Sequence, residues 1–308
     1  MRNSCYERNM EFPAEAKAVT AWADAWVVDH RPIVVRDELL AFELDHRERF
    51  MTDYGRGVEQ FYVEFDALVR MIDAMNFMDR DAWPRHRTIQ YMLVAKNLNA
   101  FHSAMDRLSK GFYVDAMSLV RGLYDCFLRI VHVSLHSDDP WGAVMDKPPA
   151  PTPGFNATSI VRDQLRLDWI SNYSIMSVFA HANAMEVLVS IQAVAVRTAP
   201  PEHFGLSLEP DQRLVETVLP LLYLVMLLDL RLVNETFGGT QAVDETALVT
   251  TSQEAVQLLT FSMRSHPKPK WTDVADDINY VLDVLAVADV GGDWRALRNA
   301  RPVVESRR

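Results

Sequence analysis

Two long helical patterns separated by only five residues constrain the fold of this chain more than any other feature. Residues 87–108 and 114–136 carry apolar side chains at helical spacing, and the sequence between them is SKGFY. A connection this short brings two helices back alongside each other, so the sequence predicts an antiparallel helical hairpin. We expect this hairpin to form the centre of the fold.

The helical pattern recurs along most of the chain. Glycine accounts for 11 of 308 residues, about half of its usual share, which disfavours a turn-rich all-β fold. The apolar run 217–228 is too short for the ~20 residues of a membrane crossing and is expected to be a buried core helix. Further helical patterns cover residues 15–28, 37–51, 57–78, 158–169, 172–188, 211–237, 252–265 and 273–289.

Two segments depart from the helical pattern. Residues 140–154 contain five prolines and are expected to form an extended, exposed connection. After residue 189 the sequence alternates like short strands, which predicts either a small β-hairpin or an extended loop. We predict an all-α multi-helix bundle around a central antiparallel helical hairpin, with an N-terminal helical region (1–84), a core bundle (85–240) and a C-terminal helical region (241–308) in one continuous domain.

Composition narrows the environment and the partners. With 31 Lys and Arg against 42 Asp and Glu, the net charge is −11, which disfavours broad nonspecific binding to nucleic acid or anionic lipid. Cys5 and Cys126 are typical of free thiols in a reducing compartment. The first residues carry charges where a secretory signal needs an apolar core. We therefore expect a cytoplasmic protein without a membrane partner.

One face of the predicted helix 114–136 is unusually polar. At 100° per residue its charged and imidazole side chains fall within an arc of about 80°, and the other side of the helix is apolar. A solvated face with an ion pair at i,i+4 spacing is the plain explanation, and a functional cleft is the alternative. This polar stripe consists of Arg121, Asp125, Arg129, His132 and His136.

A second helical segment carries a polar face of its own. In residues 172–188, Tyr173, Ser177 and His181 share one face with small alanines, which allows another helix to approach closely. In the plain interpretation Ser177 bonds a carbonyl of its own helix and His181 is a neutral core histidine. In the functional interpretation both side chains contribute to a site.

Both helices resemble those of an uncharacterised family of bacterial all-helical proteins that is loosely compared with HEPN-type domains. The pattern G-x-x-x-[D/A]-A-x-x-L-x-R-x-x-x-[D/E] matches GFYVDAMSLVRGLYD at 111–125, and Y-x-x-x-S-x-x-x-H matches 173–181. Asp125 stands where the family more often has Glu. The resemblance covers roughly residues 89–237 and implies that Arg121, Asp125, Ser177 and His181 meet in space.

HEPN-type ribonucleases use an Arg and a His in an R-x(4 to 6)-H spacing, in which Arg stabilises phosphorane charge and His moves a proton. Arg129 and His136 have this spacing, with six residues between them. Arg80 and His86 match as well, but Pro84 places them in a turn. If RNA is bound, the cluster Arg80, Arg85, His86 and Arg87 offers dense positive charge; a solvated helix N-terminus is its plain explanation.

Other enzyme classes find no support in the sequence. Glu43 and His46 form one E-x-x-H element, but a di-iron bundle needs a second copy and two further glutamates. His132 and His136 have no accompanying zinc motif. The chain has no Walker loop, dinucleotide fingerprint or nucleophile elbow. Neither a metal nor a cofactor is expected.

Two functions follow as hypotheses. In the first, the chain is an intracellular bacterial stress or phage-defence effector that acts on RNA. Asp125 would orient a cleft lined by the arginines and histidines of the stripe and by His181. In the second, the chain is a noncatalytic helical interaction or sensor protein, self-associating as a homodimer, and the network of Arg121, Asp125, Ser177 and His181 fixes helix packing.

Overall fold

Helices account for every regular element of the residues that the structure, a computed structural model, describes: 36–148, 153–167, 212–237, 245–258 and 270–301. The predicted all-α multi-helix bundle is therefore confirmed. The elements are α2 (Arg36–Asn76), η1 (Arg80–Ala82), α3 (Arg85–Ser109), α4 (Tyr113–Leu135), α5 (Pro140–Val144), α6 (Ala157–Ser159), the π-helical turn η2 (Ile160–Gln164), α9 (Gln212–Phe237), α10 (Glu245–Leu258), α11 (Trp271–Asp289) and α12 (Trp294–Ala300).

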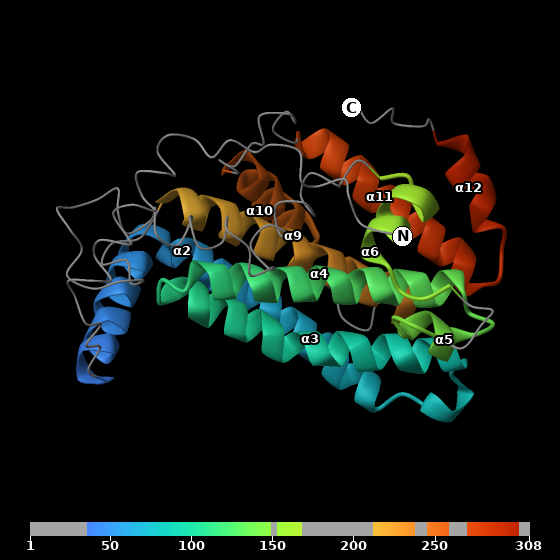
Figure 1. Cartoon of the computed structure of the whole chain (residues 1–308), viewed down its shortest axis with the longest axis horizontal. Helices are drawn as coiled ribbons and strands as arrows, with labels where there is room; N and C mark the ends of the chain where they lie inside the picture. Colours follow the sequence, from blue (N-terminus) through green and yellow to red (C-terminus); the bar gives the residue numbers. More distant parts are fainter. Residues whose placement is uncertain (1–35, 149–152, 168–211, 238–244, 259–269, 302–308) are drawn as a thin grey trace, which may run out of the picture.

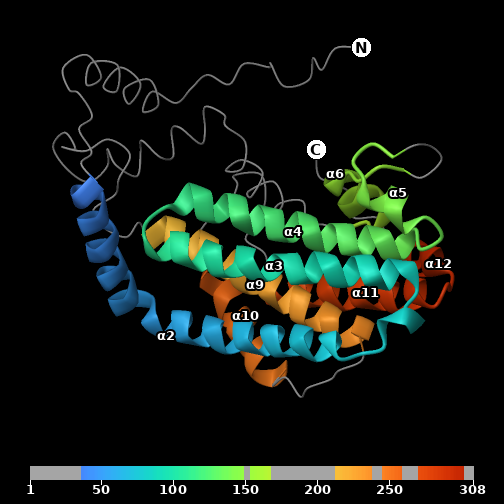
Figure 2. The same ribbon diagram turned by 90° about the horizontal axis from the view of Figure 1, so that it is seen from below.

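The predicted helical hairpin is present. Helices α3 and α4 run antiparallel and lie side by side in both views (Figures 1 and 2). The turn closes through Gly111, whose φ of 86° suits glycine, and the Phe112 N–H donates to the Arg107 carbonyl at 2.9 Å. This capping pattern satisfies the last carbonyls of α3. The short SKGFY connection is thus sufficient to reverse the chain.

Helix α9 lies behind the hairpin and forms the centre of the hydrophobic core. Its apolar run 217–228 is buried throughout, and the helix packs against α2, α3, α4, α10 and α11. Pro220 is accommodated inside the helix without ending it. The expectation of a buried core helix at 217–228 is confirmed. None of the described helices is both long enough and apolar enough to cross a bilayer.

The N-terminal part of the described chain differs from the prediction of two helices, at 37–51 and 57–78. One continuous helix, α2, runs through Gly55 and Gly57, and its first part projects from the bundle (Figure 2). The expected break is absent because buried Phe50, Val58 and Phe61 keep their helical spacing across the glycines. The hydroxyl of Tyr223 in α9 also donates a hydrogen bond to the Gly57 carbonyl.

Three further elements differ from the sequence prediction. The Pro-rich connection contains the short helix α5, because Pro140 occupies its first turn and the Asp139 carboxylate accepts a hydrogen bond from the Gly142 N–H at 3.1 Å. The segment expected to be helical from residue 158 consists of α6 and the π-helical turn η2. Helix α12, at the end of the described chain, was not anticipated from the sequence.

Several predicted elements lie outside the described residues: the helices at 15–28 and 172–188, and the β-hairpin or loop after residue 189. One hydrophobic core cluster contains residues from α2, α3, α4, α9, α10, α11 and α12. The described part of the chain therefore shares a core, while the division at residues 84 and 240 stays a prediction.

Candidate functional site

The polar stripe of α4 is not a solvated face. Arg121 and Asp125 form the expected i,i+4 ion pair, with Nε and Oδ2 3.5 Å apart, and their side chains are only 14% and 28% exposed. His132 is fully buried, and Arg129 and His136 are half-buried. The stripe therefore faces other parts of the protein, and its contacts decide what it can do.

Arg129 is held by three residues that follow α4, and its side chain is 25% exposed. One terminal nitrogen donates to the Val144 carbonyl at 2.6 Å, and the other donates to the Asp146 carboxylate at 2.6 Å. The guanidinium carbon lies 3.7 Å from the centroid of the Phe155 ring, a cation–π contact. The two terminal nitrogens and one face of the guanidinium thus contact Val144, Asp146 and Phe155.

His132 bridges α4 to two other segments. Its Nε2 lies 3.2 Å from the Pro153 carbonyl oxygen, and its Nδ1 lies 3.1 Å from Oε1 of Gln164. Each ring nitrogen therefore faces an oxygen of the protein within hydrogen-bond distance. Both ring nitrogens are therefore occupied, and neither has a lone pair directed at a substrate or a metal.

His136 is the stripe residue with the fewest fixed contacts. It forms the C-cap of α4, and its ring lies 4.5 Å from that of His132, centroid to centroid. Burial and the neighbouring His132 lower the pKa of His136, and Arg295 of α12 lowers it further, while Asp138 and Asp139 act in the opposite direction. The ring is accordingly held neutral, in the form that accepts a proton.

The two site residues predicted on the second helix, Ser177 and His181, lie outside the described residues. The predicted meeting of Arg121 with His181 is therefore still a prediction. Within the described part, Arg121 and Asp125 meet as the resemblance implies for that pair.

The E-x-x-H element is structural. The Glu43 carboxylate lies 3.6 Å from the Lys110 ammonium, and His46 is buried between α2 and the α3–α4 turn. His46 donates from Nδ1 to the Ser109 carbonyl at 2.9 Å, which leaves Nε2 to accept from the Tyr113 hydroxyl at 2.8 Å. Among the described residues, no three His, Cys, Asp or Glu side chains are placed to share a metal ion.

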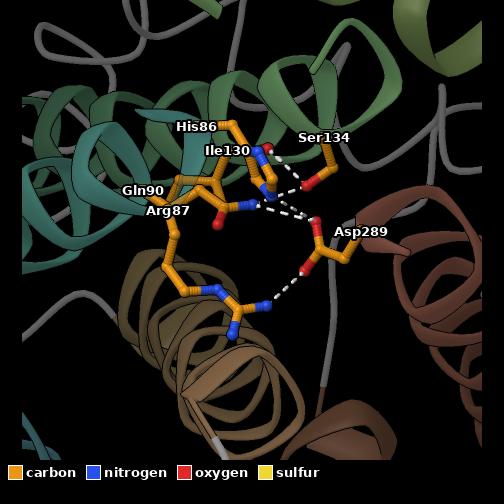
Figure 3. A network of polar contacts seen from close by, with 6 residues as sticks. All are labelled: His86, Arg87, Gln90, Ile130, Ser134 and Asp289. Atoms are coloured by element: carbon orange, nitrogen blue, oxygen red, sulfur yellow. Dashed lines mark hydrogen bonds and ion pairs between the residues drawn. The ribbon is translucent and has the colours of Figure 1, made fainter. Parts of the chain in front are cut away.

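A buried polar network lies at the other end of the hairpin (Figure 3). It includes His86 and Arg87 of the basic cluster, which are therefore not a solvated helix N-terminus, and three residues that the sequence did not single out: Gln90, Ser134 and Asp289. Gln90 donates to the Ser134 hydroxyl at 2.5 Å and reaches the Asp289 carboxylate at 3.5 Å. Asp289 also lies 3.5 Å from the Arg87 guanidinium and 3.7 Å from Nε2 of His86. Three helices, α3, α4 and α11, are joined by this network, called here the open-end network.

Opposed helix ends explain why this network forms. The first turn of α3 contains His86 and the cation Arg87, and α11 ends at the anion Asp289. A cation is unfavourable at the N-terminus of a helix dipole and an anion is unfavourable at its C-terminus. Placing the two ends together pairs those charges. Burial lowers the pKa of His86, and Arg87 lowers it further, while Asp289 raises it. Unfavourable charges at two helix ends were the sequence signal for this contact.

Two buried carboxyls inside the bundle were also missed. Asp229 of α9 is fully buried, and its Oδ2 accepts from Asn97 at 2.7 Å. Burial raises the pKa of Asp229 to about 7, against the effect of the Asn97 bond, and raises that of Glu64 in α2 to about 8. Burial also raises the pKa of the Cys126 thiol to about 12, so this cysteine is an unreactive core residue. In the sequence, a buried carboxyl of this kind is indicated by an acidic residue that ends or interrupts an apolar run.

The described site residues serve packing more than chemistry. The hydrogen-bonding groups of Arg129 and His132 face Val144, Asp146, Pro153 and Gln164, and the His136 imidazole is the stripe side chain with a neutral ring that can accept a proton. No protein-family model, curated protein or solved structure matches this chain, so what it does must follow from its own residues.

Proposed function

We propose that this chain is a noncatalytic helical binding protein of the cytoplasm, in which the polar stripe of α4 is structural. The observation that carries the proposal is the engagement of Arg129 by Val144, Asp146 and Phe155. An arginine that stabilises a phosphorane must present its donors to substrate oxygens. Both terminal nitrogens of Arg129 already donate at 2.6 Å to the protein itself.

Burial of the neighbouring stripe residues supports the same role. His132 joins α4 to Pro153 and Gln164, and the Arg121 side chain is only 14% exposed. Removing one partner from a buried charge pair strands the other charge, which destabilises a protein strongly. The stripe is therefore expected to contribute stability, with Arg121→Ala lowering the free energy of unfolding by several kcal/mol.

The test is a pair of measurements on the purified full chain. Wild-type protein incubated with total RNA is expected to leave the RNA intact. Arg129→Gln is expected to lower the melting temperature because it removes the contacts with Val144, Asp146 and Phe155. Arg49→Gln is the matched control, since Arg49 also pairs with an Asp, at 3.0 Å, but its side chain is 45% exposed and such surface pairs contribute little.

An RNA-directed effector of the HEPN-like kind is the second candidate, and the neutral, half-buried His136 is the observation that favours it. Under that hypothesis wild type cleaves RNA, and His136→Ala and His181→Ala abolish cleavage without changing the thermal melt. Such a result would overturn the noncatalytic proposal. Self-association as a homodimer is a further expectation, measured for the same samples by light scattering coupled to gel filtration.

A further inference from the structure

Three arginines converge beside Tyr280 of α11. Arg301, at the C-cap of α12, donates to the Asp277 carboxylate, and its guanidinium carbon lies 4.3 Å from the centroid of the Tyr280 ring. Arg166, which follows the C-cap of η2, donates from a terminal nitrogen to the main-chain carbonyl of Arg298 in α12 at 3.4 Å. Two chain segments more than 120 residues apart in sequence thus bring their cations to one place.

Positive charge exceeds negative charge at this place. The charges of Arg301, Arg166 and Arg298 all lower the pKa of Tyr280, while that of Asp277 raises it; burial has the largest effect and leaves the pKa raised. Among the charged groups that act on Tyr280, three are cations and one is an anion, in a chain whose net charge is −11. Such a surplus is unfavourable unless an anion is supplied.

Two hydrogen-bond donors in the cluster have no acceptor. Among the described residues, nothing accepts from the Tyr280 hydroxyl or from Nε of Arg298, and both atoms are buried. A buried donor without a partner costs about 1–3 kcal/mol. An oxyanion ligand would supply the acceptor that these two donors lack.

The backbone at Arg166 is a third, independent sign. Arg166 has a φ of 53°, in the left-handed region, where it ends the helical turn η2. The equivalent positions that end α3 and α11 are glycines, with φ of 86° and 71°. A side chain in this conformation costs about 1 kcal/mol, so arginine here is favoured only if its guanidinium contributes elsewhere.

We propose that Arg166, Tyr280, Arg298 and Arg301 form a binding site for the phosphate group of a small phosphorylated ligand. A phosphate monoester carries close to two negative charges and three acceptor oxygens, which matches the surplus charge and the unpaired donors. Arg301 covers the Tyr280 ring and forms an ion pair with Asp277. The side chains of Arg301 and Asp277 are 18% and 10% exposed. The ligand phosphate takes the place of the Asp277 carboxylate as the partner of Arg301. The site shares no residue with the α4 stripe and does not depend on the proposed function.

Isothermal titration calorimetry of the full chain with inorganic phosphate tests the proposal. Wild type is expected to bind, and Arg298→Gln is expected to weaken binding about tenfold or more through loss of a charged donor. Tyr280→Phe removes the hydroxyl but keeps the ring under Arg301, so the fold is retained and binding weakens several-fold. Arg295→Gln is the matched control from α12: its guanidinium lies 5.0 Å from the Trp294 ring centroid and outside the cluster.

Two further titrations identify the source of the phosphate. A 5′-nucleoside monophosphate binding at least as tightly as inorganic phosphate, with the same loss in Arg298→Gln, supports a small phosphorylated ligand. The proposal is overturned if inorganic phosphate gives no binding heat, or if binding persists unchanged in both Arg298→Gln and Tyr280→Phe. It is also overturned if only a single-stranded RNA binds.

Discussion

The two ends of the α3–α4 hairpin are each joined to another helix through a buried histidine, but the two histidines differ in how fully they are paired. At the closed end, His46 of α2 uses both ring nitrogens, one for the Ser109 carbonyl and one for the Tyr113 hydroxyl. At the open end, Nε2 of His86 lies 3.7 Å from Asp289, and neither this atom nor Oε1 of Gln90 has a hydrogen-bond partner in the described part of the chain.

This difference separates two roles for buried polar groups. A fully paired group loses little on burial and fixes geometry, whereas an unpaired one costs about 1–3 kcal/mol. The closed end therefore fixes how α2 docks on the hairpin turn. The open-end network tolerates change, because it contains polar atoms whose removal relieves a cost.

The largest expected effect comes from Asp229 of α9, which contacts the middle of α3 and has a hydrogen-bond partner for only one of its two carboxylate oxygens among the described residues. Its Oδ2 is bonded to Asn97, its Oδ1 has no partner among the described residues, and burial raises its pKa to about 7. Because this pKa is raised above the ordinary value of 3.8, stability is full below that value and declines as pH rises through about 7. Asp229→Asn should remove a decline of about 4 kcal/mol between pH 4 and pH 8.

Urea unfolding at a series of pH values measures this decline. Asp115→Asn is the control, since Asp115 is exposed on α4 and should leave the pH profile unchanged. A profile of Asp229→Asn as steep as that of wild type would show that burial of this carboxyl does not govern the stability of the bundle.

Two glycines sharpen the comparison between the hairpin ends. Gly111 at the closed end and Gly291 after α11 both have positive φ, but a Cβ at Gly111 would lie 2.9 Å from the His46 ring, and one at Gly291 would meet nothing within 4 Å. Gly291→Ala should cost about 1 kcal/mol, the backbone term alone. Gly111→Ala should cost about 3 kcal/mol, because it also displaces His46 from two hydrogen bonds. Equal losses in urea unfolding would contradict the proposed tight closed end.

Substitution of His46 itself tests the pairing directly. His46→Leu fills the same space with an apolar side chain but removes the hydrogen bonds to the Ser109 carbonyl and the Tyr113 hydroxyl. We expect it to lower the free energy of unfolding by about 2 kcal/mol. His102→Leu, on the exposed side of α3, should change stability by less than about 0.5 kcal/mol. If both substitutions cost the same, the His46 hydrogen bonds contribute nothing specific.

Local patterns predicted most of the helices and the α3–α4 hairpin, but not the contacts between segments far apart in the sequence. The hairpin followed from a five-residue connection, and the α4 stripe followed from helical periodicity within one segment. The contact of Gln90 with Asp289 spans 199 residues, and that of Arg129 with Asp146 depends on how a Pro-rich connection folds back. Periodicity shows which face of a helix is polar, whereas packing of distant segments decides whether that face meets water, a loop or another helix.

The smallest expected effect is at the open end, with Gln90→Leu. Gln90 is fully buried, and leucine of similar volume would remove its unpaired Oε1 together with its bond to Ser134. Ser134 keeps the Ile130 carbonyl at 3.4 Å, and Asp289 keeps Arg87 at 3.5 Å. The substitution also removes the long Gln90–Asp289 bond of 3.5 Å, which contributes little at that distance. Because the lost bonds and the relieved penalty of the unpaired Oε1 nearly cancel, stability in urea should change by less than about 1 kcal/mol. A loss as large as that of His46→Leu would mean that the open-end network is tightened by contacts equal to those of the closed end, and the contrast between the two histidines would then lie in geometry alone.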